Sequence, residues 1–328
     1  MTIKDKIYGN WEIKDPLVIE LLQTDAVQRI GKIANDGANR FLYETGNPTR
    51  LEHSLGVLYL TQRYSTNRVY HVMALLHDIA HTAFSHVVDF VKDNTETQKY
   101  HEKVIHKIVD NSQIPEVLKK YGFDVSKFYD KESLPMIGAK MPDVNTDRID
   151  YFLRDGFGIN AIDKNQIQLY LEDLHFDVEK ELFYFDDPRI AGSFALACLN
   201  TSIFDYSSPN GVGGNYLLAQ ALKVALDEKI ITDEDFLLTD DVVLEKIKKS
   251  NNTRINQFLE RLNRKVEFEF CSKEGAEYTT LVRFRNVDPF FKDDKGKLIR
   301  VSESISNYKE VISFYKNNLG EISIKEKK

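Results

Sequence analysis

The 328-residue sequence contains only two cysteines and no excess of positive charge. Cys198 and Cys271 are too few for a disulfide framework, and they favour a reducing compartment. No apolar run approaches the ~20 residues of a membrane span, and the first fifteen residues lack the apolar core of a signal peptide. The net charge of −7 gives no general attraction for nucleic acid or anionic membranes. We therefore expect a soluble, cytoplasmic protein without a membrane or nucleic-acid partner, although a local basic pocket is compatible with this charge.

The sequence is rich in helical periodicity. Apolar residues recur at helical spacing in most of the first 230 residues, and residues 174–186 predict two short strands around a turn. We expect a mainly α fold, with a helical body over residues 1–230 that includes short β-hairpins, and a small α+β accessory region over residues 231–328. Helices are predicted over residues 15–35, 50–64, 68–81, 101–110, 114–122, 145–155, 189–204, 215–229 and 306–318.

Other segments predict loops or strands. Residues 92–99 are polar and predict a loop, and the glycine-rich stretch 207–214 predicts a plain loop, or a backbone that approaches a phosphate. After about residue 264 the pattern becomes strand-like, with the "DPFF" stretch at 288–291 expected in the core or at a subunit contact. The charged C-terminal tail is expected to fray.

Seven of the eight histidines fall between residues 53 and 106. In a continuous helix His77 and His81 share one face, because residues four apart are neighbours. His86 lies nine residues beyond His77, roughly half a turn out of phase at ~3.6 residues per turn. We therefore predict a break of the helix at residues 82–85 that folds His86 back. The isolated histidines His71, His106 and His175 are expected to be satisfied histidines of the core.

A metal site made of histidine and aspartate needs ligands from more than one element. His53 on the preceding helix and Asp147 are candidates to join the adjacent pair His77 and Asp78. A nitrogen and oxygen donor set favours a six-coordinate divalent ion with open positions, such as Mn, Fe, Co, Ni or Mg. The absence of a cysteine pair in this region argues against a structural zinc site.

Four segments occur in a characteristic order: "RLEHSLGV" (50–57), "LLHDIAHTAFSH" (75–86), "HE" (101–102) and "DRIDYFLRD" (147–155). With them the chain resembles the HD-domain metal-dependent phosphohydrolases, whose pattern is a lone His, an adjacent His-Asp pair and a distant Asp. More narrowly it is similar to the deoxynucleoside triphosphate triphosphohydrolase branch, over about residues 8–230 with core motifs at 50–155.

The resemblance implies a role for each matching residue. The metal ligands would be His53, His77, Asp78 and Asp147. The catalytic and phosphate-contacting set would be His81, His86, His101 and Glu102. Substrate would be contacted by Arg50, Arg148 and Tyr151 at the phosphates and by Asp155 and Asn35 at the sugar.

The chain departs from the branch at several of these positions. Arg148 stands where lysine is usual, and Asn35 stands where glutamine is usual. Gly31 replaces an arginine that some members use for a regulatory nucleotide. Residues 201–214 lack the basic cluster that the branch carries there for the triphosphate.

The resemblance implies hydrolysis of nucleotide phosphate esters by a metal-activated water. We expect a (deoxy)nucleoside triphosphate triphosphohydrolase or a related nucleotide phosphohydrolase. Two alternatives are a nucleotide-binding regulator whose metal site senses rather than turns over, and a phosphodiesterase of cyclic or linear dinucleotides. Because members of the branch are often oligomeric, we also expect a homo-oligomer, a dimer or higher.

Overall fold

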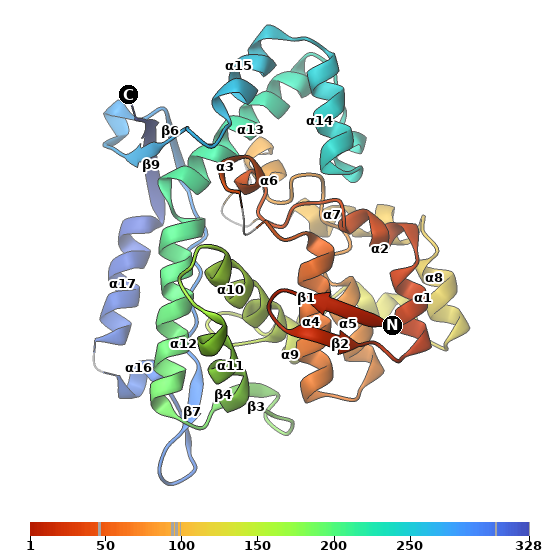
Figure 1. The fold of residues 1–328 in the computed structure, drawn as a ribbon, viewed down its shortest axis with the longest axis vertical. Coiled ribbons are helices and arrows are strands. Elements are labelled where there is room, and N and C mark those ends of the chain that lie inside the picture. The colour runs from red at the N-terminus through yellow and green to blue at the C-terminus, as the bar shows by residue number, and fades with distance from the viewer. Residues whose placement is uncertain (45–46, 93–94, 96–97, 99, 306, 328) are drawn as a thin grey trace.

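The computed structural model of the protein describes residues 1–44, 47–92, 95, 98, 100–305 and 307–327. Helices dominate the fold, and the strands form small sheets (Figure 1). The mainly α fold predicted from the sequence is confirmed. The helices up to residue 227 are α1 Pro16–Leu22, α2 Asp25–Ile30, α3 Asn39–Leu42, α4 Arg50–Tyr64, α5 Arg68–Leu76, α6 Val87–Val91, α7 Tyr100–Val109, α8 Ile114–Lys120, α9 Pro135–Gly138, α10 Thr146–Gly158, α11 Lys164–Asp173, α12 Pro188–Thr201 and α13 Pro209–Asp227.

The rest of the chain adds further helices and most of the strands. Short single-turn segments lie at Val125–Phe128, Lys131–Ser133, Ser202–Tyr206, Asp233–Leu237 and Lys273–Gly275. The later helices are α14 Asp240–Lys249, α15 Thr253–Arg261, α16 Val301–Ser304 and α17 Tyr308–Leu319. The strands are β1 Thr2–Asp5, β2 Gly9–Glu12, β3 Leu174–Asp177, β4 Leu182–Phe185, β5 Phe268–Phe270, β6 Tyr278–Leu281, β7 Phe290–Lys292, β8 Leu298–Arg300 and β9 Glu321–Glu326.

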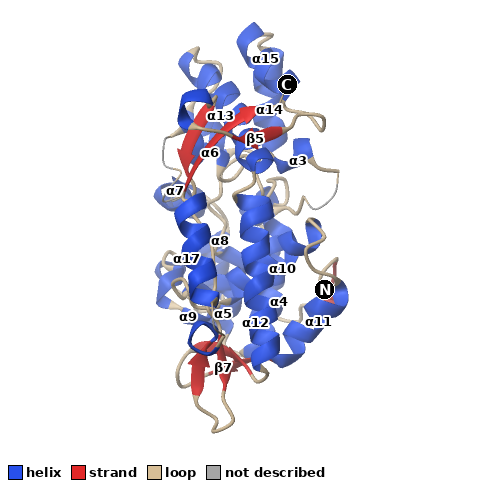
Figure 2. Ribbon diagram, turned by 90° about the vertical axis from the view of Figure 1, so that its left-hand side faces the viewer, coloured by secondary structure: helices blue, strands red, loops and turns tan. Residues whose placement is uncertain are grey.

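The strands form three separate groups. β1 and β2 make an N-terminal hairpin, and the order of the second sheet is β3-β4-β7-β8, with β4 and β7 parallel. The third sheet has the order β5-β9-β6. Figures 1 and 2 place the second sheet at one end of the molecule, while α14 and α15 lie at the opposite end. The C-terminal residues therefore contribute to both ends.

The helices in the middle of the molecule position the candidate site. α4 packs against both α5 and α10, and α10 packs in turn against α12. α13 packs against α6 and α15. Buried apolar clusters fill the spaces between these helices, and Phe291 of the "DPFF" stretch is buried in the cluster beneath α10 and α12, as predicted.

Several predicted helices are confirmed with small shifts of their ends, one is divided into two, and one ends early. The helix predicted over 15–35 is divided into α1 and α2, because the chain turns at Gln23 and Thr24. The Thr24 hydroxyl donates to the Leu21 carbonyl and so ends the first helix. The helix predicted over 68–81 ends at Leu76.

The prediction of a plain loop over 207–214 is wrong, because α13 begins at Pro209. Ser208 caps this helix by accepting from the amide of Gly211 at 3.0 Å. A Cβ at Gly213 would lie 2.3 Å from the Phe268 ring, so this glycine permits close packing of the helix. Glycine here indicates tight contact and not a flexible turn.

The frayed tail predicted at the C-terminus is also wrong. Residues 321–326 form β9, which pairs with β5 and β6 on its two sides. Ile322 and Ile324 are buried, and their alternation explains the strand. The loop predicted at 92–99 falls largely outside the described residues. Among the described residues, no helix is both long and apolar enough to cross a membrane.

Candidate active site

Two of the predicted metal ligands, His53 and Asp147, lie near the start of two different helices, and the N-terminus of each helix is fixed by a cap. Thr49 and Glu52 form a reciprocal capping box at the start of α4, and this places His53 one turn into the helix. Asn145 caps α10 by accepting from the amide of residue 148 at 2.7 Å, which places Asp147 at the second helical position. Local capping signals in the sequence therefore set the position of both ligands.

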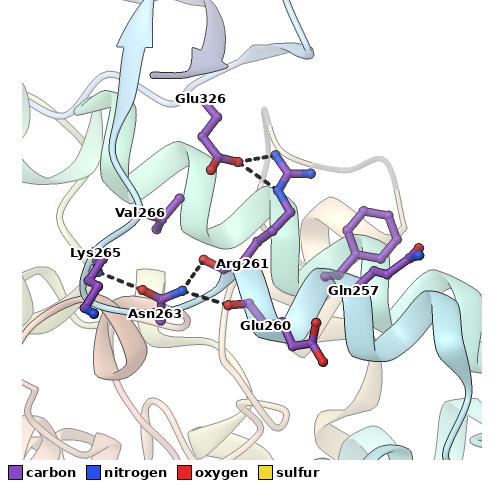
Figure 3. A pocket seen from close by; sticks show the side chains of 8 residues that line it. Gln257, Glu260, Arg261, Asn263, Lys265, Val266 and Glu326 are labelled. Carbon is purple, nitrogen blue, oxygen red and sulfur yellow. Dashed lines mark hydrogen bonds and ion pairs between the residues drawn. The ribbon is translucent and has the colours of Figure 1, made fainter. Parts of the chain in front are cut away.

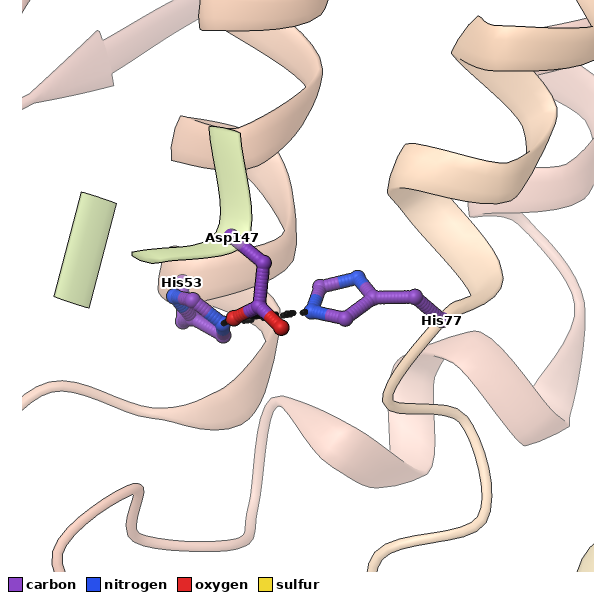
Figure 4. Close-up of side chains that lie close together, drawn as sticks. All are labelled: His53, His77 and Asp147. Carbon is purple, nitrogen blue, oxygen red and sulfur yellow. Dashed lines mark hydrogen bonds and ion pairs between the residues drawn. The ribbon is translucent and has the colours of Figure 1, made fainter. Parts of the chain in front are cut away.

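Figure 4 shows the Asp147 carboxylate between the imidazole rings of His53 and His77. The two Nε2 atoms are 3.2 Å apart, and Asp147 Oδ1 lies 3.2 Å from His53 Nε2 and 3.7 Å from His77 Nε2. Asp78 adjoins this group, with its Oδ1 3.5 Å from His77 Nε2 and its Oδ2 3.7 Å from His53 Nε2. The structure therefore brings all four predicted ligands together.

The orientation of the two imidazoles suits a metal ion. His53 Nδ1 hydrogen-bonds to Asp150 at 2.7 Å, and His77 Nδ1 hydrogen-bonds to the Ala74 carbonyl at 2.9 Å. Carboxylates and carbonyls accept, so Nδ1 carries the proton and the lone pair of Nε2 is turned toward the site. Two such lone pairs together with the carboxylates form a donor set that suits a divalent cation.

The charge of the site also favours a bound divalent ion. Burial by itself lowers the pKa of His53, but hydrogen bonds to Asp147 and Asp150 outweigh this and raise the pKa to about 10. In the metal-free protein the excess of negative charge thus draws a proton onto a buried imidazole. A divalent ion would replace that proton, which agrees with the nitrogen and oxygen donor set.

A buried ion-pair network holds the His53 ring from behind. Asp150 accepts from Arg154 at 3.0 and 2.9 Å, and Arg154 also donates to Asp5 at 3.0 Å. A Cβ at Gly56 would lie 1.8 Å from Asp150 Oδ1, so only glycine leaves room for this network beside α4. Sequence reasoning did not identify Asp150, although its spacing of three residues from Asp147 places it near the same face of α10.

Helix α5 ends at Leu76, and the next helix, α6, begins at Val87. The predicted break is confirmed, but it begins about five residues earlier than expected. Arg29 stabilises the irregular stretch by donating to the carbonyls of Ile79 at 2.7 Å and His81 at 2.9 Å. The expectation that His77 and His81 share a helix face is therefore wrong, because tertiary hydrogen bonds replace the helical ones.

The break brings three histidines together. The His81 ring stacks on His101 with centroids 4.1 Å apart and meets the edge of His86 at 5.0 Å. Burial lowers the pKa of His86 to about 4 and that of His101 to about 3, and it also lowers the pKa of His81. All three are therefore neutral at neutral pH.

Two acidic residues, Asp89 and Glu102, accompany these histidines in the sequence and differ in burial. Asp89 contacts His86, with its Oδ2 3.1 Å from His86 Nδ1. Glu102 is exposed at the rim of the site. In the described part of the chain the buried Nδ1 of His101 has no hydrogen-bond partner, so it is available to a ligand.

Arg50 connects the metal site to the substrate side. It is buried and donates to Asp78 at 2.6 Å, to Ser85 at 2.9 Å and to the Asn35 carbonyl at 2.8 Å. Arg148 contacts the carbonyls of Ala139 and Asp143. These two arginines are thus held in place before any ligand binds.

A cavity of about 490 Å³ lies in front of the metal ligands and the histidines. It is lined by all the predicted site residues except His77. It is also lined by residues that sequence reasoning missed, from segments far apart in the chain: Asp36, Lys131, Asp205, Tyr206, Arg283 and Arg285.

The missed basic residues belong to the cavity for different reasons. Lys131 donates to Asp147 at 2.8 Å. The Arg285 guanidinium lies over Tyr151 at 5.4 Å and over Tyr206 at 5.0 Å. Arg283 and Arg285 lie two residues apart in a stretch that forms neither helix nor strand, and both line the cavity, so their spacing of two was the available signal.

The remaining histidines do not line this cavity, but the prediction of core positions is wrong for His106 and His175, whose side chains are 64% and 42% exposed. His71 Nε2 hydrogen-bonds to the Ser65 carbonyl at 2.7 Å, His106 pairs with Asp110 on the surface, and His175 pairs with a carboxylate at 2.9 Å. A separate surface hollow beside α15 is shown in Figure 3. Its Arg261 is paired with Glu277 and Glu326.

Comparison with known proteins agrees with this site. Residues 50–173 match the HD domain family. The chain is 32% identical over 315 residues to the uncharacterized protein YdhJ of Bacillus subtilis, with 93% of each chain covered. It is 27% identical over 292 residues to the metal-dependent phosphohydrolase cns2 of Cordyceps militaris, with 88% of this chain and 84% of the relative covered. The chain therefore belongs to the HD-domain family of metal-dependent phosphohydrolases.

Two further comparisons concern the branch and the fold. The chain is 24% identical over 188 residues to the deoxynucleoside triphosphate triphosphohydrolase SAMHD1 homolog of Dictyostelium discoideum, with 47% of this chain and 36% of the relative covered. The crystal structure of a phosphohydrolase from Bacteroides thetaiotaomicron has a TM-score of 0.75 and 17% identity, and 99% of each chain is covered. The second comparison concerns the fold alone.

Proposed function

We propose that this protein hydrolyses a phosphate ester of a nucleotide, as a (deoxy)nucleoside triphosphate triphosphohydrolase or a related nucleotide phosphohydrolase. The observation that carries the proposal is one cavity that combines the His and Asp ligand set, the cluster of His81, His86 and His101, and a set of cations. The distant similarity to the SAMHD1 homolog supports the nucleotide.

The cations support binding of more than one phosphate group. Arg50 and Lys131 adjoin the metal ligands, and Arg148, Arg283 and Arg285 line the rest of this side. The basic cluster that residues 201–214 lack is supplied here by the stretch 282–289, which is far away in the sequence. Arginine forks suit phosphate oxygens because they donate two parallel hydrogen bonds.

The chain's own residues provide positioning and proton transfer. A bound divalent ion would lower the pKa of a water and polarise a phosphoryl oxygen. His81, His86 and His101 are neutral before substrate binds. His81 and His101 can each donate one N–H to a phosphoryl oxygen, whereas the single N–H of neutral His86 is held by Asp89. A nearby phosphate dianion favours a second proton on an imidazole. That proton can pass to the leaving oxygen as the P–O bond breaks and water oxygen bonds to phosphorus.

The test is a substrate panel read by product identity. The purified protein is stripped of metal, supplied with Mn²⁺ and incubated with dNTPs, NTPs and nucleoside monophosphates. Release of triphosphate, pyrophosphate or phosphate separates the reaction modes. Metal-dependent release from none of them, or full activity in a variant carrying His77→Ala and Asp78→Ala, would refute the proposal.

The same assay, extended to cyclic and linear dinucleotides, also decides between this proposal and the alternatives from the sequence. A nucleotide that binds and is recovered intact indicates a regulator, and cleavage confined to cyclic or linear dinucleotides indicates a phosphodiesterase. We further propose that the chain forms a dimer or higher homo-oligomer in solution. Light scattering of the eluted protein measures its mass, and a monomer at micromolar concentration would contradict this.

A further inference from the structure

Lys131 is a cation of the cavity whose partner is a carboxylate of the metal site. Its Nζ donates to Oδ2 of Asp147 at 2.8 Å, and among the described residues this ammonium has no second hydrogen-bond partner. The other carboxylate oxygen, Oδ1, lies 3.2 Å from His53 Nε2 and 3.7 Å from His77 Nε2. The two oxygens of Asp147 are therefore divided between the ligand imidazoles and Lys131.

The backbone fixes both ends of this ion pair. Lys131 opens the single-turn segment Lys131–Ser133, which Asp130 caps by accepting from a backbone amide of the segment at 2.9 Å. A Cβ at Gly138 of α9 would collide with the Lys131 carbonyl, so glycine lets α9 pack closely against this segment. Asp147 is held in turn by the capped start of α10. The side chains of Lys131 and Asp147 are only 32% and 17% exposed, so water competes less for this pair than for one on an open surface.

The number of oxygens that each aspartate offers decides how much of the ion stays free. A carboxylate can bind a divalent ion through one oxygen or through both. Lys131 occupies Oδ2 of Asp147, and Arg50 donates to Oδ2 of Asp78 at 2.6 Å. If each of the four ligand residues gives one donor atom, a six-coordinate ion keeps two positions open. If Asp147 bound through both oxygens, it would fill one of these positions.

Building on the proposed function, we infer that Lys131 is a positioning residue that restricts Asp147 to one ligand oxygen and thereby keeps a position on the ion open for the reaction. Both the attacking water and a phosphoryl oxygen need such a position. Lys131 also lines the cavity, and the two N–H groups that Asp147 does not accept remain for a phosphoryl oxygen.

The experiment counts the waters on Mn²⁺ in the full-length protein without substrate, by pulsed electron–nuclear double resonance in isotope-labelled water. Lys131→Met removes the ammonium and keeps an apolar side chain of similar length. The parent protein should hold two waters on the ion, and Lys131→Met should hold one, because Asp147 then binds through both oxygens. Calorimetry should show an affinity for Mn²⁺ about 10-fold higher or more, because a positive charge beside the ion is gone. Lys131→Arg keeps a cationic donor and should keep both waters.

Lys140→Met is the matched control. Lys140 lines the same cavity, but its Nζ pairs with Glu132 at 3.2 Å, and among the described contacts it touches no metal ligand. This variant loses the same charge and should keep the parent number of waters. Circular dichroism of all variants checks that they are folded.

The outcomes separate the inference from the proposed function. An unchanged or larger number of waters in folded Lys131→Met overturns the inference, and so does weaker binding of Mn²⁺, which would show that Lys131 holds Asp147 on the ion. Loss of a water in Lys140→Met as well overturns it, because the effect would then come from charge alone. None of these measurements needs turnover. Absence of metal-dependent turnover of every nucleotide therefore refutes the proposed function, while the number of waters still decides the inference.

Discussion

Asp150 offers a sharp test of how the metal site is held. It contacts no predicted substrate group, but it hydrogen-bonds to His53 Nδ1 at 2.7 Å and is fully buried. Asp150→Asn keeps the size of the side chain and removes the charge that orients and polarises His53. Loss of such a carboxylate behind a ligand histidine typically weakens metal affinity about 10- to 100-fold. This is roughly 1.4–2.7 kcal/mol.

The assay is a calorimetric titration of the metal-stripped protein with Mn²⁺, with circular dichroism and thermal unfolding as checks on folding. The variant also weakens the pairing of Arg154, so some loss of stability is expected as well. Asp5→Asn is the matched control, because Asp5 contacts Arg154 at the far end of the same network without contacting His53. It should lose stability but keep its metal affinity. A folded Asp150→Asn protein that binds Mn²⁺ as tightly as the parent would refute the reasoning.

Three further predictions concern stability. In Gly56→Ala the new Cβ would lie 1.8 Å from Asp150 Oδ1. This variant should lose about 1–3 kcal/mol of unfolding free energy and bind Mn²⁺ more weakly, and unchanged values would contradict the close packing of Gly56 against Asp150. Arg29→Met removes the hydrogen-bond donors to the carbonyls of Ile79 and His81. Each unpaired carbonyl should lower the free energy of unfolding by roughly 1–3 kcal/mol, which denaturant unfolding measures. Burial raises the pKa of Asp205 to about 7, so between pH ~4 and 7 the folded protein holds a proton that the unfolded chain releases, and stability falls as pH rises. Asp205→Asn should therefore be stabilised relative to the parent at pH 8 but not at pH 4, and an equal difference at both values would contradict this.

The division of the chain at residue 230 remains a prediction. The segments on either side of this position do share structure, because β7 and β8 of the later part extend the sheet that begins with β3 and β4. Limited proteolysis would show whether the later segment separates as a unit.

The sequence by itself determined the local parts of this protein. Helical periodicity predicted α4 and α10, and the caps Thr49 and Asn145 explain why His53 and Asp147 lie in first turns. The mismatch of phase between His77 and His86 required a break in the helix. These features depend on residues a few positions apart, whose geometry the backbone itself dictates.

Only the tertiary structure decided the rest. Asp150 lies 97 residues from His53, and Arg285 comes from a segment more than a hundred residues after Tyr151. Arg29 ends a helix early by hydrogen bonds to carbonyls about fifty residues away, and the tail forms β9 because two distant strands pair with it. Such contacts depend on how the helices pack and not on local periodicity. For the same reason the hydrogen bond from Tyr206 to Asp155 could be identified only in the folded chain.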